Sequence, residues 1–460
     1  MPVGTVYFVG AGPGDIGLIT VKGLERLKQA DVVLYDRLVN PELLTYTRPD
    51  CEKIYCGKLP KHHILRQEQI NAALVAKAKE GKTVVRLKGG DPGVFGRVGE
   101  EAAELAKHGI PFEIVPGITS GIAAPLYAGI PVTHREYGHS FALVSAHGQA
   151  TEPQVDWSAL AKMDTIAFYM GVANLPLICD QLLAHGKRSD TPVILIRWGT
   201  MGRQQTLEGT LETIAKKAEE AAFSNPAITL VGDVITLRKT TNWFEKKRLF
   251  GKQILLASDG TETEFAQTLR AEGADVFEFP KWKLVKKEIE RYVFAKLPSY
   301  EQIIFTSSES VRFFFAALRS EKIDVRTIKA ELCARTPRAK RALEERGFHV
   351  SDEQQPLGKT LVVGEKGLGS KEWCLTYEVK QEETSQLLWE RMKEEADVRT
   401  VIFPTVASVH CLLAMGDTEW LSQRTILCFD NETKETAQTY GLFARCIEKE
   451  TLIDDVARER

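Results

Sequence analysis

A short β-branched segment that runs directly into a glycine-rich turn is the feature that most constrains the fold of this chain. Thr83–Leu87 has the composition of a buried strand, and Gly-Gly-Asp-Pro-Gly follows at positions 89–93. A strand that enters such a turn must bend sharply and leave backbone N–H and C=O groups without strand partners. In an open α/β sheet a ligand can bind on such bare backbone, although the same residues also suit an ordinary turn.

The same strand-and-turn pattern recurs nearby. Thr5–Val9 reads as a strand that ends in the loop Gly10–Asp15, and Phe112–Val115 reads as a strand that ends in Pro-Gly-Ile-Thr-Ser-Gly. A further strand, Val32–Tyr35, ends in an Asp-Arg pair. Amphipathic helices are expected between these strands. Alternating strands and helices predict a mostly parallel sheet.

The loop Gly10–Asp15 lacks the known phosphate-binding patterns. Counting from Gly10, the sixth position is Asp15 and not glycine, so the dinucleotide fingerprint fails, and no Gly-Lys-Ser/Thr follows for a P-loop. Exposed backbone with one carboxylate suits a ligand that carries a ribose, an amino group or a sulfonium. A nicotinamide-dependent dehydrogenase is therefore the weakest of the candidate functions.

The pattern changes after about residue 140. Five apolar segments read as strands, some of them close enough in sequence to pair antiparallel, at Phe141–Ser145, Thr165–Tyr169, Pro192–Ile196, Arg203–Leu207 and Ala227–Val231. Asn-Trp-Phe followed by a basic run near residue 245 reads as a boundary, after which a fresh βα unit begins. We therefore expect a first domain over 1–245, with lobes of about 1–138 and 139–245, and a second over 250–460.

The second domain contains two related units in which a strand runs into Ser and Thr residues at the start of a helix. They begin at Ile303–Ser307 and Val401–Thr405. Hydroxyls at a helix N-terminus can bind a carboxylate, and they also cap ordinary helices, so both interpretations stay open at this point.

Composition excludes several classes. The 460 residues carry 60 Lys and Arg against 62 Asp and Glu, a formal net charge of −2, which gives no electrostatic reason to expect nucleic acid or an anionic membrane as partner. No apolar run reaches the roughly 18–20 residues of a membrane span, and no signal peptide is visible, so we expect a cytoplasmic protein. The eight cysteines include no CxxC pair, and His62 and His63 are adjacent in one loop, so we expect reduced thiols and no metal site.

Seven motifs in a set order carry a family resemblance. They are GAGPGD at 10–15, YDRLV at 35–39, GK at 57–58, RLKGGDPGVFGRVGEE at 86–101, VPGITS at 115–120, PVTHR at 131–135 and FYMG at 168–171. Together they resemble the uroporphyrinogen-III C-methyltransferases of the tetrapyrrole methylase family, over about residues 4–244. The resemblance implies a two-lobed methylase fold, a homodimer, and transfer of two methyl groups from S-adenosylmethionine to C2 and C7 of uroporphyrinogen III, which gives precorrin-2.

The resemblance also assigns roles to residues. Cofactor contacts are expected at Pro13, Gly89, Gly90, Asp91, Val94, Thr119, Ser120, Met170 and Gly199. The proton acceptor falls on Asp36 and the proton donor on Lys58. The substrate carries eight carboxylates, and the cations expected around them are Lys58, Arg37, Arg97, His134 and Arg135. A methyl group already activated as a sulfonium needs no metal, so the enzyme must supply position and a proton-transfer pair.

The second domain resembles uroporphyrinogen-III synthase, a two-lobed flavodoxin-like α/β protein that cyclises hydroxymethylbilane to the substrate of the first domain. The matching segments are 303–314, 401–409 and 432–442, and the expected carboxylate-binding residues are Thr306, Ser307, Ser310, Ser408 and Thr433. Asp430 stands beside them, where an acid repels an anionic substrate. Two alternatives therefore stay open: an active synthase, or a different precorrin methyltransferase with a non-catalytic tetrapyrrole-binding module. The product's destination, sirohaem or cobalamin, also stays open.

Overall fold

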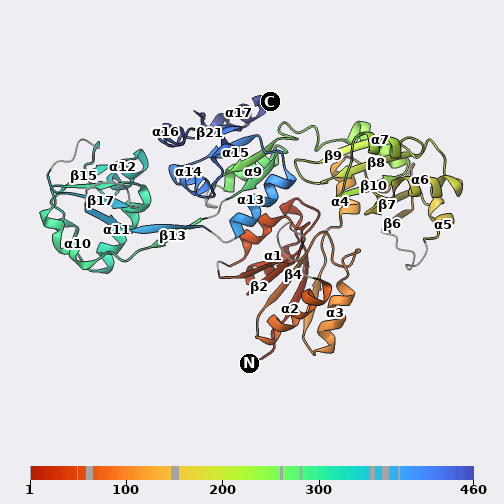
Figure 1. Ribbon diagram of the computed structural model, residues 1–460, viewed down its shortest axis with the longest axis horizontal. Coiled ribbons are helices and arrows are strands. Elements are labelled where there is room, and N and C mark those ends of the chain that lie inside the picture. Colours follow the sequence, from red (N-terminus) through yellow and green to blue (C-terminus); the bar gives the residue numbers. More distant parts are fainter. Residues whose placement is uncertain are drawn as a thin grey trace.

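The computed structural model describes residues 2–48, 50–57, 66–146, 155–258, 263–279, 282–352, 358–364, 372–381 and 384–459. Across these residues the chain is a mixed α/β protein with four five-stranded sheets and one two-stranded ribbon (Figure 1). We call residues up to Thr241 the N-terminal half and residues from Gln253 onward the C-terminal half. Within the described part, no helix is both long and apolar enough to cross a membrane.

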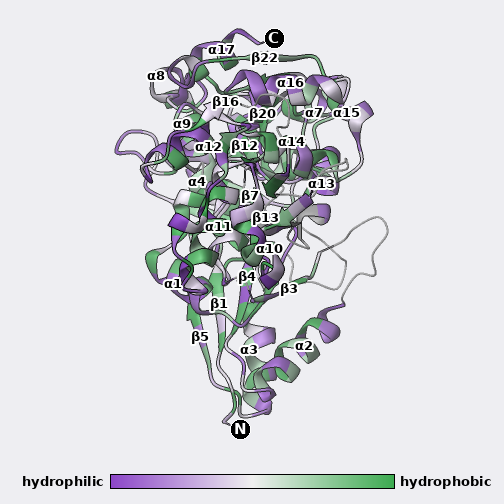
Figure 2. Cartoon of the chain, turned by 90° about the vertical axis from the view of Figure 1, so that its left-hand side faces the viewer, coloured by the Kyte–Doolittle hydropathy of each residue, from purple (hydrophilic) through white to green (hydrophobic). Residues whose placement is uncertain are grey.

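The first sheet is fully parallel, as the alternating pattern predicts. Its spatial order is β3-β2-β4-β1-β5. The strands are β1 (Val6–Gly10), β2 (Val32–Tyr35), β3 (Glu52–Tyr55), β4 (Val84–Lys88) and β5 (Phe112–Val115). The helices between them are α1 (Val21–Gln29), α2 (Gln67–Lys79) and α3 (Val98–Lys107). In Figure 2, green is clear along β1 and β5, and purple patches lie on the surrounding helices. The central strands β1, β2 and β4 are the buried ones, as expected where a sheet lies between amphipathic helices.

The second sheet is mixed, with the order β6-β7-β10-β8-β9. The β6–β7 pair is parallel, and the other pairs are antiparallel. Its strands are β6 (Phe141–Ser145), β7 (Thr165–Tyr169), β8 (Pro192–Arg197), β9 (Gln205–Thr210) and β10 (Ala227–Val231). Its helices are α4 (Ser120–Tyr127), α5 (Trp157–Ala161), α6 (Leu175–Ala184), α7 (Ile214–Glu220) and α8 (Arg238–Thr241).

One predicted strand of this sheet is displaced. The expected segment Arg203–Leu207 begins too early, because Gln204 belongs to the preceding turn, where its side chain accepts a hydrogen bond from the Thr200 N–H at 3.0 Å. Strand β9 therefore begins at Gln205. A polar residue used inside a turn gives no local signal that distinguishes it from a strand residue.

The C-terminal half contains two parallel sheets joined by a ribbon. The third sheet has the order β12-β11-β20-β21-β22, and the fourth has the order β16-β15-β14-β17-β18. The third is built from β11 (Gln253–Leu256), β12 (Asp275–Glu278), β20 (Thr400–Phe403), β21 (Thr425–Cys428) and β22 (Ala444–Cys446). The fourth is built from β14 (Gln302–Phe305), β15 (Glu331–Ala334), β16 (Ser351–Asp352), β17 (Thr360–Gly364) and β18 (Glu372–Leu375). The ribbon pairs β13 (Trp282–Lys286) antiparallel with β19 (Tyr377–Gln381).

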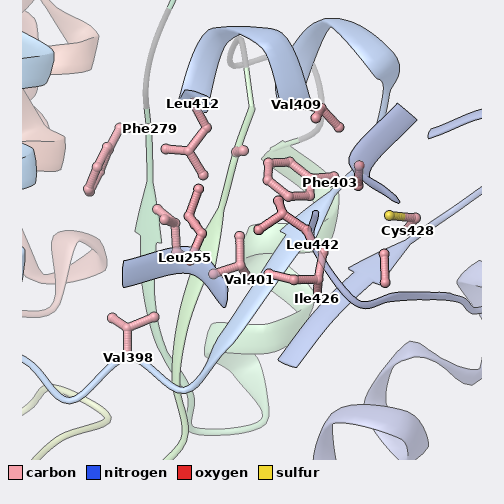
Figure 3. Packing of buried hydrophobic residues seen from close by; sticks show 14 of the residues in the cluster. Leu255, Phe279, Val398, Val401, Phe403, Val409, Leu412, Ile426, Cys428 and Leu442 are labelled. Carbon is pink, nitrogen blue, oxygen red and sulfur yellow. The ribbon is translucent and has the colours of Figure 1, made fainter. Parts of the chain in front are cut away.

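Further helices cover these two sheets. They are α9 (Thr263–Ala271), α10 (Arg291–Lys296), α11 (Ser308–Ser320), α12 (Pro337–Glu344), α13 (Thr384–Glu395), α14 (Val406–Leu413), α15 (Thr418–Ser422), α16 (Asn431–Thr439) and α17 (Leu452–Arg458). Figure 3 shows one core, in which Leu255, Val401 and Phe403 of the third sheet contact apolar residues of its neighbours. Trp389 and Met392 of α13 belong to the same core, so this helix is fixed to the third sheet.

Candidate functional site

The ends of three parallel strands meet at one place in the first sheet. The loop after β1 and the loop after β4 exchange backbone hydrogen bonds, from Gly90 N–H to Gly12 O at 2.8 Å and from Gly12 N–H to Gly90 O at 3.2 Å. The turn after β5 touches both: a Cβ added at Gly117 would lie 2.4 Å from Gly90 O, and one added at Gly10 would lie 2.6 Å from Gly117 Cα. The backbones approach so closely that only glycine fits at these two positions.

Asp91 connects two of these turns. Its carboxylate accepts the Gly93 N–H at 2.7 Å through one oxygen and the Gly117 N–H at 2.8 Å through the other. Val94 N–H donates to Asp91 O at 3.2 Å, which closes the same loop. The structure therefore gives Asp91 a role in holding the shape of the predicted cofactor loop.

The second sheet contributes the opposite wall. The Tyr169 hydroxyl lies 2.5 Å from Thr119 Oγ1 and accepts the Gly121 N–H at 2.7 Å, so the end of β7 is fixed to the start of α4. Met170 follows with a φ of 55° and an exposed side chain. Asp15 N–H donates to Thr200 Oγ1 at 3.0 Å, which brings the glycine loop after β1 to the end of β8.

These contacts bring together the predicted cofactor residues from both lobes. The five segments that carry them are the loops 10–15, 88–94 and 115–121 and the strand ends around 170 and 199. Gly199 lies so close to α4 that an added Cβ would be 2.3 Å from Ala124 Cβ. The predicted residues Pro13, Gly89, Gly90, Asp91, Val94, Thr119, Ser120, Met170 and Gly199 all lie in these segments.

A buried charge network lies beneath Asp36. Arg86 donates to Asp36 Oδ1 at 2.6 Å and lies 3.3 Å from Glu101 Oε1, and Lys88 donates to the same Glu101 oxygen at 2.9 Å. Arg86 is 2% exposed, whereas the Asp36 side chain is 33% exposed and faces solvent. Burial, together with the neighbouring Arg86 charge, lowers the pKa of Lys88. The network fixes the carboxylate of Asp36 at the end of β2.

The predicted substrate cations are divided between different environments. Arg97 is the N-cap of α3, with a left-handed backbone, and its side chain pairs with Glu100 at 2.5 Å. Arg37 pairs with Glu395 of the C-terminal half at 3.2 Å. Lys58, the predicted proton donor, lies outside the described residues, as do His62 and His63.

His134 and Arg135 lie elsewhere in the chain. Their short hairpin is closed by hydrogen bonds between His134 and Gly138, and Gly138 contacts Asp164, which immediately precedes β7. Tyr169 is at the other end of that strand, about 13 Å from its first residue, Thr165, at the usual rise per residue. Within one chain the structure therefore does not bring His134 and Arg135 to the contact between Tyr169 and Thr119.

A second candidate site is a cavity of about 1000 Å³ between the two sheets of the C-terminal half. The N-terminal ends of four helices line it, at Thr306–Ser308 for α11, Thr336–Arg338 for α12, Thr405–Ala407 for α14 and Asn431–Thr433 for α16. Arg335, Arg338 and Lys449 also line it, as do Glu309, Asp430 and Glu432. Burial, with the nearby Asp430 charge, raises the pKa of Glu432 to about 7. Helix N-termini and cations favour an anionic ligand, and the acids oppose it.

The predicted hydroxyls of this half have different environments. Thr306 and Ser307 line the cavity, and Ser307 Oγ lies 2.9 Å from the Tyr377 hydroxyl. Ser310 and Ser408 are fully buried, and each donates its hydroxyl to the carbonyl of its own helix N-cap. Their hydroxyls therefore cap α11 and α14 and do not form the cavity wall. Thr433 is buried at the third position of α16, and its N–H donates to Asp430 Oδ1 at 2.7 Å.

Comparison with known proteins places the chain in a family. Residues 5–215 match the model for tetrapyrrole (corrin/porphyrin) methylases, and residues 263–368 match the model for uroporphyrinogen-III synthase HemD. A uroporphyrinogen-III C-methyltransferase of Bacillus subtilis (strain 168) is 46% identical over 461 residues, which cover 96% of this chain and 95% of that protein. The chain belongs to the uroporphyrinogen-III C-methyltransferase family. It is an enzyme with a tetrapyrrole methylase region followed by a HemD-like region.

Other relatives cover the N-terminal half. A uroporphyrinogen-III C-methyltransferase of Priestia megaterium is 60% identical over 235 residues, 51% of this chain and 99% of that protein. A siroheme synthase of Stutzerimonas stutzeri (strain A1501) is 47% identical over 251 residues, 54% of each chain. A solved structure of the Thermus thermophilus uroporphyrin-III C-methyl transferase with S-adenosyl homocysteine aligns with 51% of this chain and 100% of its own, at 39% identity and a TM-score of 0.45.

Several residues of the candidate cofactor site and of the C-terminal cavity are not predicted from the sequence. Tyr169, which joins the two lobes, and Phe95, whose ring lies 5.0 Å from that of Tyr169, both lie inside the family motifs without an assigned role. In the cavity, Thr336 and Pro337 were overlooked. A Thr N-cap followed by Pro at the first helical position is a helix-start signal that could have revealed them.

Proposed function

We propose that the N-terminal half methylates uroporphyrinogen III at C2 and C7 to give precorrin-2, with S-adenosylmethionine as methyl donor. The family relationship supports the substrate class, and the convergence of three loops and two strand ends from the two lobes supports the position of the donor. The observation that carries the proposal is the free space beside Gly90, where an added Cβ would find no heavy atom closer than 3.8 Å, although the N–H and the C=O of Gly90 are both paired with Gly12. A ribose or an amino acid moiety can approach the loop closely there.

The cofactor, when bound, supplies an electrophilic methyl group. Residues of the loops at 10–15, 88–94 and 115–121 would hold it, and Met170 and Gly199 would line its other side. Asp91 keeps the loops in shape through its two backbone hydrogen bonds. None of these residues is proposed to transfer a proton, and that role is assigned to Asp36 and Lys58.

Asp36 is the proposed proton acceptor. Arg86 donates to one carboxylate oxygen and so holds the carboxylate at the end of β2, where the Asp36 side chain stays partly exposed. Lys58 is the proposed proton donor, and Arg37 and Arg97 are the proposed partners of substrate carboxylates. His134 and Arg135 stay predictions for the same role.

Product analysis tests this function. Full-length protein is incubated anaerobically with uroporphyrinogen III and methyl-labelled S-adenosylmethionine, and the product is analysed by mass spectrometry and ¹³C NMR. Two labelled methyl groups, at C2 and C7, are expected. A product labelled at another ring carbon would support a different precorrin methyltransferase and refute the proposal.

For the C-terminal half we propose cyclisation of hydroxymethylbilane to uroporphyrinogen III. The cavity supports this, because four helix N-termini and three cations surround a volume of about 1000 Å³. The alternative is a module that binds a tetrapyrrole without reaction. Hydroxymethylbilane given to the full chain separates the two: formation of the type III isomer above the spontaneous type I product supports a synthase, and type I alone supports the module.

Three further properties belong to this proposal. We take the domain division at 1–245 and 250–460, because each sheet is built from one side of that boundary.

We propose a cytoplasmic homodimer in which a second copy covers the edge strand β5, where Phe112 and Ile114 are exposed, and the adjoining Ile122 and Leu126 of α4. In Figure 2, β5 appears green at the edge of the first sheet. Analytical ultracentrifugation of Ile114→Glu against the unmodified chain tests the dimer.

A further inference from the structure

Helix α13 of the C-terminal half contacts the turn that follows β2 in the N-terminal half. Arg391 donates from Nη2 to the backbone carbonyl of Arg37 at 2.7 Å. Glu395, one turn further along the helix, accepts from Arg37 Nε at 3.2 Å. Arg37 is thus held at its main chain and at its side chain by two residues of another half of the molecule. Figure 1 shows α13 beside the first sheet.

The two residues of α13 are buried at this contact. The side chains of Arg391 and Glu395 are 7% and 9% exposed, and they lie 3.6 Å apart. A buried charge is costly unless it is paired, so such side chains persist where they have defined partners. The guanidinium of Arg391 also lies 5.9 Å from the centre of the Tyr55 ring at the end of β3. The contact therefore reaches two neighbouring strand ends of the first sheet.

Helix α13 is itself a rigid support. Trp389 and Met392 are each 2% exposed and belong to the core of the third sheet. They alternate along the helix with Arg391 and Glu395, so one face enters the third-sheet core and the adjoining face presents its charges to the N-terminal half. A charged side chain on such a helix can hold its partner in one position, because packed cores resist small displacements.

The residue that this contact constrains is next to Asp36. Arg86 holds the Asp36 carboxylate from within the first sheet at 2.6 Å, and α13 holds the following residue from outside. We propose that Arg391 and Glu395 are positioning residues for methyl transfer, and that they act by fixing the turn that carries Asp36. This inference rests on the proposed role of Asp36. It means that the HemD-like region completes the methyltransferase site in addition to any activity of its own.

The contact also changes what Arg37 can do. With Nε committed to Glu395, the Arg37 side chain is directed by the C-terminal half before any substrate arrives. Loss of Arg391 removes the hydrogen bond to the Arg37 carbonyl, so the neighbouring Asp36, the proposed proton acceptor, is displaced. This change should mainly lower turnover. Loss of the Glu395 charge should also change the KM for the substrate, because it releases a cation.

The experiment compares Arg391→Ala, Arg391→Lys and Glu395→Gln in the full chain. Lys393→Ala is the matched control, since Lys393 lies on the same helix and pairs with Asp417 inside the C-terminal half at 2.8 Å. Two measurements are made on each variant: steady-state methylation of uroporphyrinogen III, and hydrogen–deuterium exchange of the peptide that contains Asp36–Val39. Isothermal titration with S-adenosylmethionine reports the cofactor loops separately.

Arg391→Ala is expected to lower kcat for methylation about tenfold, because small misplacements of catalytic groups are costly, with unchanged S-adenosylmethionine affinity. Exchange in Asp36–Val39 should become faster. Arg391→Lys should recover part of both effects, and Lys393→Ala should match the unmodified chain. Exchange that is unchanged in Arg391→Ala, or faster exchange with an unaltered kcat, would overturn the inference. An unmodified chain that produces no precorrin-2 would instead refute the proposed function, and the exchange data would still decide whether α13 holds the turn.

Discussion

Replacement of Asp91 gives the sharpest test of the proposed cofactor loops. Its two carboxylate oxygens accept the N–H groups of Gly93 and Gly117 at 2.7 and 2.8 Å. Hydrogen bonds to a charged acceptor contribute about 1.5–3 kcal/mol each, and the partly exposed position of Asp91 favours the lower value. Asp91→Ala therefore removes about 3 kcal/mol that hold the two turns together. Asp91→Asn keeps one accepting oxygen and loses about half of that.

This energy should appear in cofactor affinity, because the loosened turns must be ordered again when S-adenosylmethionine binds. At about 1.4 kcal/mol per tenfold change, Asp91→Ala should weaken binding about a hundredfold and Asp91→Asn about tenfold. Isothermal titration with S-adenosylmethionine measures both. Thermal unfolding of each variant shows whether the whole chain is still folded.

Glu104→Gln serves as the control, since Glu104 lies on α3 and pairs with Lys107 at 2.9 Å, away from these turns. Its affinity should equal that of the unmodified chain. The reasoning would be refuted if Asp91→Ala bound S-adenosylmethionine within twofold of the unmodified chain. Equal affinities for the Ala and Asn variants would show that a direct contact, and not the shape of the turns, carries the effect.

Three other perturbations follow from the same structure. Asp36→Asn should lower turnover by at least about a hundredfold with unchanged S-adenosylmethionine affinity, measured by steady-state kinetics and titration, because it removes the proposed proton acceptor and leaves the proposed cofactor loops intact. Glu101→Gln should reduce the free energy of unfolding by about 3–5 kcal/mol in urea denaturation, since it leaves the buried Arg86 and Lys88 without their shared carboxylate. As pH rises through about 7, Glu432 loses its proton and adds negative charge to the cavity, so uroporphyrin III binding, measured by fluorescence from pH 6 to 8, should weaken; Glu432→Gln should flatten this dependence.

Much of the first sheet follows from local sequence. The strands Val32–Tyr35 and Phe112–Val115 have the predicted bounds, because β-branched and apolar runs between glycine turns leave few alternatives. The place where the proposed cofactor loops meet also follows, since the carboxyl ends of parallel strands lie on one edge of a sheet. The family motifs then assigned roles that spacing alone left open.

Other parts of the sites depend on tertiary placement. His134 and Arg135 resemble substrate ligands in sequence, but the direction of β7 separates their hairpin from Tyr169. Ser310 and Ser408 stand in hydroxyl-rich turns, but the third position of a helix turns each hydroxyl back to its own N-cap. In each case the residue type was informative, whereas the direction of the side chain was set by the geometry of the element.

The contact between the two halves could not be predicted either, because it depends on charged side chains that only tertiary placement buries. The buried charges also indicate what the contact does. Nothing in the local sequence of α13 indicates that its charged residues Arg391 and Glu395 are buried, and the same holds for Arg203 of the N-terminal half, which lies 3.3 Å from Asp275 of β12. Buried ion pairs add little stability, because the loss of hydration offsets the attraction. They do require one relative position of the two surfaces, since any other leaves charges unpaired. Such an interface determines the orientation of the two halves more than it stabilises their association. In this orientation α13 lies against the turn beside Asp36.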